Sequence, residues 1–259
     1  MAIKLGCFSR PWNGYTLEEF IAGTAAAGYD VIGTMALNKE PVISADMSDD
    51  EVKAVRELVE DAGLTASTVM GQFPLDGERA VSVERLKLHI DKLAVFGAKF
   101  MLHCGSAPGP AADRFYDVYA ECCGYAEDQG VMLTLKPHGG ITNTGADLIY
   151  ALDLIDHDNF RIYYDAGNIV HYKGLNPVNE LRVLADFVVG VCIKDSEGEL
   201  IGVNILPGAG VVDFEGVFAV LKDAGFDGHL VVECLGGESL DEVNANAVAT
   251  REFLEGLIA

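Results

Sequence analysis

The chain has 259 residues, and half of them are apolar, which is enough for one large domain with a sizeable core or for two small ones. Forty Asp and Glu against eighteen Lys and Arg give a net charge of −22, which repels nucleic acid and anionic membranes. No apolar run approaches the length of a membrane span, and the first residues lead into a strand pattern without a long apolar segment, so we expect a soluble cytoplasmic protein.

Short apolar runs with β-branched residues predict eight buried parallel strands. In chain order these are Ile3–Phe8, Tyr29–Gly33, Leu64–Val69, Ala98–His103, Val131–Lys136, Phe160–Asp165, Phe187–Lys194 and Gly228–Glu233. A glycine directly precedes four of them, at Gly28, Gly63, Gly97 and Gly130, with spacings of 33 to 35 residues. Such a glycine is typical of the left-handed residue that ends a helix, so each interval predicts one strand–helix repeat.

Amphipathic stretches between the strands predict eight helices. They are Thr16–Ala27, Ser48–Ala62, Val81–Phe96, Ala111–Gln129, Thr144–Asp156, Pro177–Leu184, Phe214–Ala224 and Ser239–Leu257. Thr16 and Ser48 each begin a capping-box pattern, and Asp213 precedes its helix as an N-cap. Eight such units indicate an α/β fold, a single (β/α)8 TIM barrel over residues 1–259. A doubly wound open sheet is the alternative, but no GxGxxG pattern follows the first strand.

Charged residues stand where four predicted strands end. In a barrel, the carboxyl ends of the strands meet at the face that carries active sites. The alternation of side chains along a strand places Lys136, Asp165, Lys194 and Glu233 toward the inside, with His138 close to Lys136. Buried charges are costly unless they are paired. The pattern therefore predicts catalytic residues at the barrel mouth, and the alternative is a salt-bridged plug.

The same strand ends carry a resemblance to a known family. The chain resembles the xylose isomerase-like barrels, a family of sugar isomerases and epimerases, in five segments. These are Lys136-Pro137-His138, Asp165-Ala166-Gly167-Asn168, Ile193-Lys194-Asp195, Pro207-Gly208-Ala209-Gly210-Val211-Val212-Asp213-Phe214 and Val231-Val232-Glu233. The resemblance implies a divalent ion held after four consecutive strands by Glu, Asp, His and Glu. Asp165 and Glu233 match two of these positions, whereas Lys136 and Cys192 stand where the family has Glu and often His.

These departures leave two hypotheses for the chemistry. In the first, Asp165, Glu233 and His138 hold Mn²⁺ or Mg²⁺, with Asn168 or His171 as a further partner. In the second there is no metal, and the Lys136 ammonium polarises a substrate carbonyl or steadies an enediolate. Glu233 then moves the proton, in preference to Asp165, and His138 shuttles a proton between neighbouring oxygens.

Other side chains are candidates for substrate binding. Trp12 is the only tryptophan and lies in the first strand-to-helix loop, where it either stacks on a sugar ring or anchors the loop. His103 ends the fourth strand and either lines the pocket or belongs to the core. Asn168 and His171 follow the sixth strand. The glycines of residues 207–210 allow backbone N–H groups to approach an oxyanion or a phosphate.

The predicted function is that of a sugar or keto-sugar isomerase or epimerase, which removes a proton next to a carbonyl and forms an enediolate-type intermediate. One alternative is a lyase or hydratase that acts on 3-keto-glycosides, because the same proton abstraction can expel a leaving group. Another is a barrel that binds a carbohydrate without transforming it. A nucleic-acid repair role rests on fold analogy alone, and the net charge opposes it. We expect a small carbohydrate as the substrate, no nucleic-acid or membrane partner, and possible homo-oligomers.

Overall fold

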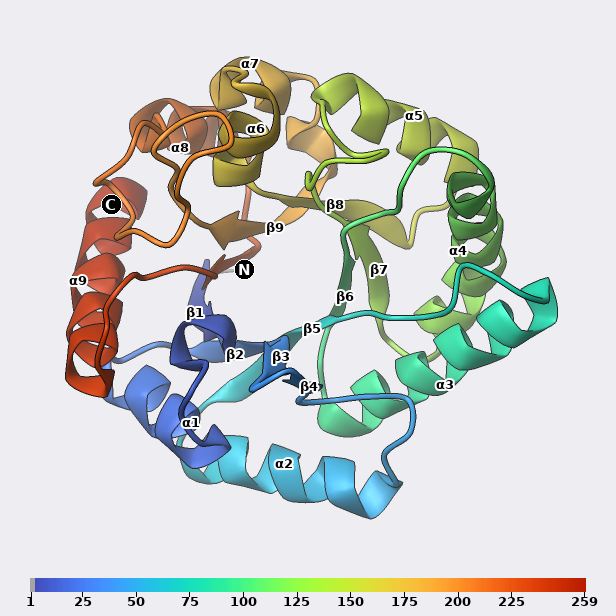
Figure 1. The fold of residues 1–259 in the computed structure, drawn as a ribbon, viewed down its shortest axis with the longest axis horizontal. Coiled ribbons are helices and arrows are strands. Elements are labelled where there is room, and N and C mark those ends of the chain that lie inside the picture. Colours follow the sequence, from blue (N-terminus) through green and yellow to red (C-terminus); the bar gives the residue numbers. More distant parts are fainter. Residues whose placement is uncertain (1–2) are drawn as a thin grey trace.

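Eight parallel strands close into a barrel in the computed structural model, which describes residues 3–259 (Figure 1). The strands are β1 (Lys4–Phe8), β2 (Val31–Thr34), β5 (Thr65–Met70), β6 (Phe100–His103), β7 (Met132–Leu135), β8 (Phe160–Tyr164), β9 (Val188–Ile193) and β10 (His229–Val232). Their order around the barrel is β1-β10-β9-β8-β7-β6-β5-β2, and every neighbouring pair is parallel. The predicted barrel and its eight strands are confirmed, and the doubly wound sheet is wrong.

Helices surround the barrel as an outer ring (Figure 1). They are α1 (Leu17–Ala26), α2 (Asp49–Asp61), α3 (Arg79–Phe96), α4 (Pro110–Asp128), α5 (Gly145–Ile155), α6 (Ala166–Lys173), α7 (Pro177–Arg182), α8 (Phe214–Asp223) and α9 (Leu240–Ile258). The sequence predicts all of them except α6. Two short 3-10 turns, η1 (Arg10–Trp12) and η2 (Ala185–Phe187), and a small antiparallel hairpin of β3 (Ala36–Leu37) and β4 (Glu40–Pro41) complete the elements.

The helix ends form as the capping signals predict. Thr16 and Ser48 complete capping boxes at the starts of α1 and α2, and the Asp213 side chain accepts a hydrogen bond from the backbone at the start of α8. The four repeat glycines all have a positive φ, between 72° and 85°, which suits a residue without a Cβ. Local chemistry therefore fixes where the helices stop and the next strands begin.

Apolar side chains fill the barrel interior below the mouth. Phe8, Val31, Phe100, Leu102, Tyr163, Cys192 and Val231 form a cluster that is separate from the larger core between strands and helices. Thr68 donates a hydrogen bond to the Tyr163 hydroxyl across this interior, at 3.1 Å. The barrel is thus a packed core and not a channel, so chemistry is confined to its carboxyl-terminal mouth. Among residues 3–259, no helix has the length and apolar character needed to span a membrane.

Candidate active site

Four charged side chains meet at the mouth, each from the first residue after a strand. Lys136 follows β7, Asp165 follows β8, Lys194 follows β9 and Glu233 follows β10. The Lys136 Nζ lies 3.1 Å from Asp165 Oδ2 and 2.5 Å from Glu233 Oε2. The Lys194 Nζ lies 3.3 Å from Asp165 Oδ2 and 2.9 Å from Glu233 Oε1. Each ammonium therefore bridges the same two carboxylates, and the two oxygens of Glu233 are divided between them.

A fifth charged residue, Arg10, joins this cluster and is absent from the sequence prediction. It lies in η1 after β1, and its Nη1 donates to Glu233 Oε1 at 2.7 Å. The four residues from the strand ends are at most 2% exposed, whereas the Arg10 side chain is 39% exposed. Arg10 stands two residues after the end of β1, and this position beside a strand end is the sequence signal that could have identified it. We call Arg10, Lys136, Asp165, Lys194 and Glu233 the mouth cluster.

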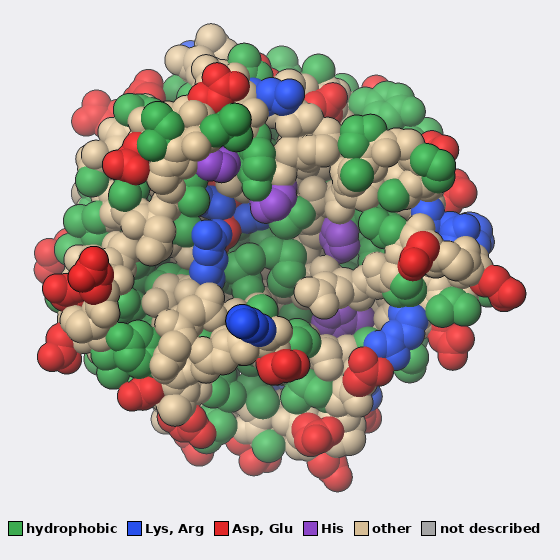
Figure 2. Space-filling model, viewed as in Figure 1, with side chains coloured by type: hydrophobic (Ala, Val, Ile, Leu, Met, Phe, Trp, Pro, Cys, Tyr) green, Lys and Arg blue, Asp and Glu red, His purple; other side chains and the backbone are tan. Residues whose placement is uncertain are grey.

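The mouth cluster is positive, although the chain as a whole is strongly acidic. Three cationic side chains surround two carboxylates, which leaves one net positive charge. Figure 2 shows basic and histidine side chains around the central hollow, and acidic side chains mostly toward the periphery. A site with a net positive charge attracts ligands or intermediates that carry negative charge. The mouth is therefore suited to an oxyanion.

Burial and pairing both change the proton affinities in the cluster. Burial acts to raise the pKa of Glu233, but Lys136, Lys194 and Arg10 outweigh it and hold that pKa well below its usual range. Burial acts to lower the pKa of Lys136, but the adjacent carboxylates of Glu233 and Asp165 hold it well above its usual value. At neutral pH the carboxylate and the ammonium are therefore both charged.

Stability alone does not account for such an arrangement. Buried ion pairs lose solvation that their attraction barely repays, and apolar residues of similar volume are often at least as stabilising. The interior directly below is already packed with apolar side chains. Strongly shifted pKa values at a barrel mouth are more typical of a functional site.

A divalent metal does not fit the mouth cluster as it stands. Within the described part of the chain, the one group of three potential ligands is Asp165, Cys192 and Glu233, whose ligand atoms lie within 4.8 Å of one another. The Lys136 Nζ hydrogen-bonds to all three, at 3.8 Å from the sulfur. Burial holds the pKa of Cys192 well above its usual value, so the sulfur is a neutral thiol. The space between the ligands is therefore taken by an ammonium.

His138, predicted as a metal ligand beside Asp165 and Glu233, is not part of that group of potential ligands. Its side chain is exposed at the rim, and its Nε2 lies 3.2 Å from the Tyr172 hydroxyl. Desolvation at the mouth, followed by repulsion from Lys136 and Lys194, lowers the pKa of His138 to about 4. The imidazole is thus neutral near pH 7, and its Nε2 pairs with the Tyr172 hydroxyl. Tyr172, in α6, is absent from the sequence prediction.

Helix α6 holds the other two residues predicted after β8. Asp165 is its N-cap, since its Oδ1 accepts from the Asn168 N–H at 2.9 Å. The Asn168 side chain is buried and donates to the Pro137 carbonyl at 2.7 Å, so it supports the backbone beside Lys136. His171 has a buried Nδ1 without a protein partner among the described residues. The Asn168 backbone thus contacts the mouth cluster at Asp165, whereas the His171 Nδ1 has no hydrogen bond with the cluster among the described residues.

Trp12, predicted either to stack on a sugar ring or to anchor its loop, offers no exposed ring face to a ligand. Its side chain has no exposed surface, its ring packs against Phe20, and its Nε1 donates to Asn244 Oδ1 at 3.0 Å. It ties the η1 turn to α1 and α9. The loop-anchor alternative accounts for these contacts, and the anchor holds the turn from which Arg10 reaches Glu233.

Replacing Trp12 with alanine is expected to lower the free energy of unfolding by about 3–5 kcal/mol, because it leaves a cavity under η1. Replacement with phenylalanine keeps a ring near Phe20 and loses the Asn244 hydrogen bond, so its smaller loss gives the matched comparison. Urea unfolding of both variants measures the difference. Equal stability of the alanine variant and the wild type would contradict the anchor role.

His103 lies at the end of β6 inside a group of aromatic rings. Phe73, Phe115 and Tyr119 surround it at ring-centre distances of 4.9 to 5.8 Å, and its Nδ1 accepts from the Gly105 N–H. It also borders a surface cavity of about 420 Å³ with Phe73 on its wall. The His103 ring therefore packs in the core and also lines a surface cavity. No hydrogen bond or ion pair joins this ring to the mouth cluster among the described residues.

The stability of the protein is expected to depend on the protonation of His103. Burial, aided by His89 and His138, lowers its pKa from 6.5 to about 4, so between these values the unfolded chain binds a proton that the folded protein does not. Stability then falls as the pH falls from about 6.5 to 4. In urea unfolding, His103→Gln should lessen this slope by up to about 1.4 kcal/mol per pH unit. An unchanged slope would contradict the assignment.

The glycine loop of residues 207–210 is folded around Asp195 and does not offer the predicted anion site. The N–H groups of Gly208 and Gly210 both donate to Asp195 Oδ2, at 2.9 and 2.8 Å, and the Val212 N–H donates to Oδ1. Asp195 is fully buried. Its carboxylate uses the donors that a phosphate would need, so this loop is a structural turn.

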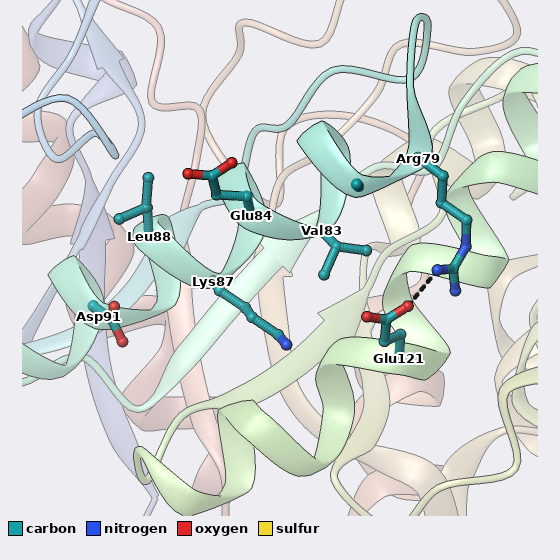
Figure 3. Close-up of a pocket in the computed structure, with 8 residues that line it drawn as sticks. Arg79, Val83, Glu84, Lys87, Leu88, Asp91 and Glu121 are labelled. Atoms are coloured by element: carbon teal, nitrogen blue, oxygen red, sulfur yellow. Dashed lines mark ion pairs between the residues drawn. The ribbon is translucent and has the colours of Figure 1, made fainter.

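A larger surface groove lies away from the mouth, between α3 and α4 (Figure 3). It has a volume of about 620 Å³, and the Arg79–Glu121 ion pair joins the two helices at one end. Val83 and Leu88 contribute apolar surface to it, and none of the predicted site residues lines it. The mouth cluster thus remains the candidate active site.

This chain is similar in sequence to a family of TIM barrels and to individual enzymes. The sequence profile of the xylose isomerase-like TIM barrel matches residues 21–257. Inosose dehydratase from Clostridium perfringens (strain 13 / Type A) is 25% identical over 300 aligned positions, covering 98% of this chain and 97% of that protein. Inosose dehydratase from a second strain of the same species is also 25% identical, but over 147 residues only. That alignment covers 50% of this chain and 49% of the length of that protein, so the chain spans about half of it.

Epimerases are similar as well. L-ribulose 3-epimerase from Methylomonas sp. (strain DH-1) is 24% identical over 262 positions, 93% of this chain and 86% of that protein. The crystal structure of D-psicose 3-epimerase in the presence of D-fructose superposes with a TM-score of 0.82 at 14% identity, covering 99% of both chains. At that identity the likeness concerns the fold.

Proposed function

Since the chain belongs to the xylose isomerase-like TIM-barrel family, we propose that it is a sugar or keto-sugar isomerase or epimerase that removes a proton next to a carbonyl. The observation that carries the proposal is the mouth cluster. It holds an ionised carboxylate among three cations at the face where barrel enzymes perform their chemistry. The similarity to L-ribulose 3-epimerase supports the same class of reaction.

Glu233 is the base in this proposal, and its neighbours stabilise the product of proton removal. Its low pKa makes it a weak base while all three cations bind it. An enediolate oxygen that forms nearby competes for the same hydrogen-bond donors. As Lys136 or Arg10 turns toward that oxygen, the pKa of Glu233 rises and it accepts the proton more readily.

Access to Glu233 passes Arg10, the partly exposed member of the cluster. A substrate that pairs with the guanidinium displaces it from Glu233 and reaches the carboxylate. His138, neutral and paired with Tyr172 at the rim, can then move a proton between adjacent substrate oxygens.

Hydrogen exchange tests this proposal. The protein is incubated with a panel of ketoses and keto-sugars in deuterated water, and incorporation at the carbon next to the carbonyl is followed by NMR. We expect exchange and conversion for at least one sugar. Tight binding of a sugar with no exchange in any member of the panel would contradict it and favour a carbohydrate-binding barrel.

A lyase is the second candidate, because inosose dehydratases are among the relatives. After the same proton abstraction, the C–O bond at the β-carbon can break, and its oxygen takes up a proton and leaves as water or as the free aglycone, which gives an unsaturated ketone. Products from an inosose and from a 3-keto-glycoside separate the candidates: an isomeric sugar supports the isomerase, and an elimination product supports the lyase.

We also propose that the protein works in the cytoplasm on a small carbohydrate and forms homo-oligomers. Three apolar side chains in the loop between β9 and α8, those of Leu200, Ile201 and Val211, are 56% to 72% exposed. Such exposed apolar groups suit contact with another chain. Light scattering after size-exclusion chromatography gives the mass, and a monomer at all concentrations would contradict this assembly.

A further inference from the structure

The Lys136 ammonium lies between three side chains that are competent to bind a metal. Its Nζ is 3.1 Å from Asp165 Oδ2, 2.5 Å from Glu233 Oε2 and 3.8 Å from Cys192 Sγ. Each ammonium has three N–H donors, and here each donor has one of these acceptors. A divalent ion with carboxylate ligands sits about 2.0–2.2 Å from each oxygen. The spacing around Nζ is instead that of hydrogen bonds.

Lys194 supplies a second positive charge to the same two carboxylates. Its Nζ contacts Asp165 Oδ2, the atom that Lys136 also contacts, and the other oxygen of Glu233. The two ammonium groups together carry the formal charge of one divalent ion. Since Lys136 is fully buried and Lys194 nearly so, neither can leave for solvent without exposing the carboxylates.

We infer that the Lys136 ammonium, supported by Lys194, takes the place of a divalent ion in this barrel, so that the protein binds no metal between Asp165 and Glu233. The consequence for catalysis rests on the proposed function: proton abstraction proceeds without a metal, and the developing oxyanion is stabilised by N–H donors of the mouth cluster that turn toward it from Glu233. The inference about metal binding itself is independent of the substrate.

Charge reversal at Lys136 tests the inference directly. Lys136→Glu replaces the ammonium by a carboxylate beside Asp165, Cys192 and Glu233, and changes the cluster from one net positive to one net negative charge. The control is Lys53→Glu on the surface of α2, where the lysine side chain is 57% exposed, because it makes the same change in total charge. Both variants are titrated with Mn²⁺ by calorimetry and electron paramagnetic resonance, without any sugar.

We expect Lys136→Glu to bind one Mn²⁺ per chain at least about tenfold more tightly than Lys53→Glu, and the wild type to match Lys53→Glu within a few-fold. Equal Mn²⁺ affinity of the two variants would overturn the inference. Should Lys136→Glu fail to fold, Mn²⁺ binding to the wild type is compared with Mn²⁺ binding to Asp165→Asn. A wild type that binds one Mn²⁺ per chain, with binding lost in Asp165→Asn, would overturn the inference, whereas the same weak binding in both upholds it.

The outcome is separable from that of the proposed function. A protein that binds no metal and exchanges no sugar proton leaves the inference standing and removes the isomerase. A protein that exchanges sugar protons only with a bound Mn²⁺ would support the isomerase and overturn the inference.

Discussion

Replacing Glu233 with glutamine is expected to reduce turnover by at least about a thousandfold, since glutamine keeps the size of the side chain and cannot accept the proton. Glu233 is the carboxylate that all three cations contact and that lies below Arg10. Steady-state kinetics on the sugar that exchanges gives the effect. Glu238→Gln, on the exposed part of the loop that follows β10, makes the same charge change and is the matched control.

The variant must be measured while it is folded. Removal of the Glu233 charge leaves three cations with one carboxylate, which should lower the free energy of unfolding by about 3–5 kcal/mol. A domain of ordinary stability survives that loss at 25 °C. Urea unfolding and sugar binding serve as checks. Wild-type turnover in Glu233→Gln would remove Glu233 as the base.

Lys136→Met is the second change with a large expected effect. It removes one of the two ammonium groups that contact both carboxylates, and it leaves the cluster without net charge. The loss of one fixed donor to a developing oxyanion typically lowers the turnover number about 10²- to 10³-fold, and we expect at least this loss. Because the interaction strengthens only as the oxyanion forms, the loss should fall mainly on kcat and less on KM.

The control for this variant is Lys173→Met, at the exposed end of α6. It removes one positive charge near the same face without touching the mouth cluster, and it should keep wild-type kinetics. Lys136→Met with wild-type kcat would show that the ammonium only pairs with the carboxylates, as in the salt-bridged plug.

Much of the fold could be predicted because the chain repeats one local pattern. A helix that ends at a left-handed glycine, followed at once by a β-branched run, depends on neighbouring residues alone. Gly28 and Gly97 show this in their φ values of 82° and 85°. The alternation of side chains along strands then placed Lys136 and Glu233 together, although they are 97 residues apart.

Features that depend on loop paths could not be predicted in the same way. Helix α6 has only eight residues and no long amphipathic pattern, and its N-cap, Asp165, is the same residue that carries a predicted functional role. Arg10 reaches Glu233 from the η1 turn, which ends at the buried Trp12. The use of the glycine-loop N–H groups by Asp195 likewise depends on a tertiary contact that no short motif encodes.

In the proposed reaction, the ammonium groups of the mouth cluster, and not a bound metal, support proton abstraction at Glu233. Deuterium incorporation into a converted sugar is measured with wild-type protein that has been treated with a chelator and checked for residual metal by elemental analysis. The structure predicts the same exchange rate before and after treatment, and no gain on addition of Mn²⁺ or Mg²⁺. Loss of exchange on chelation, with recovery when one of these ions is returned, would contradict it.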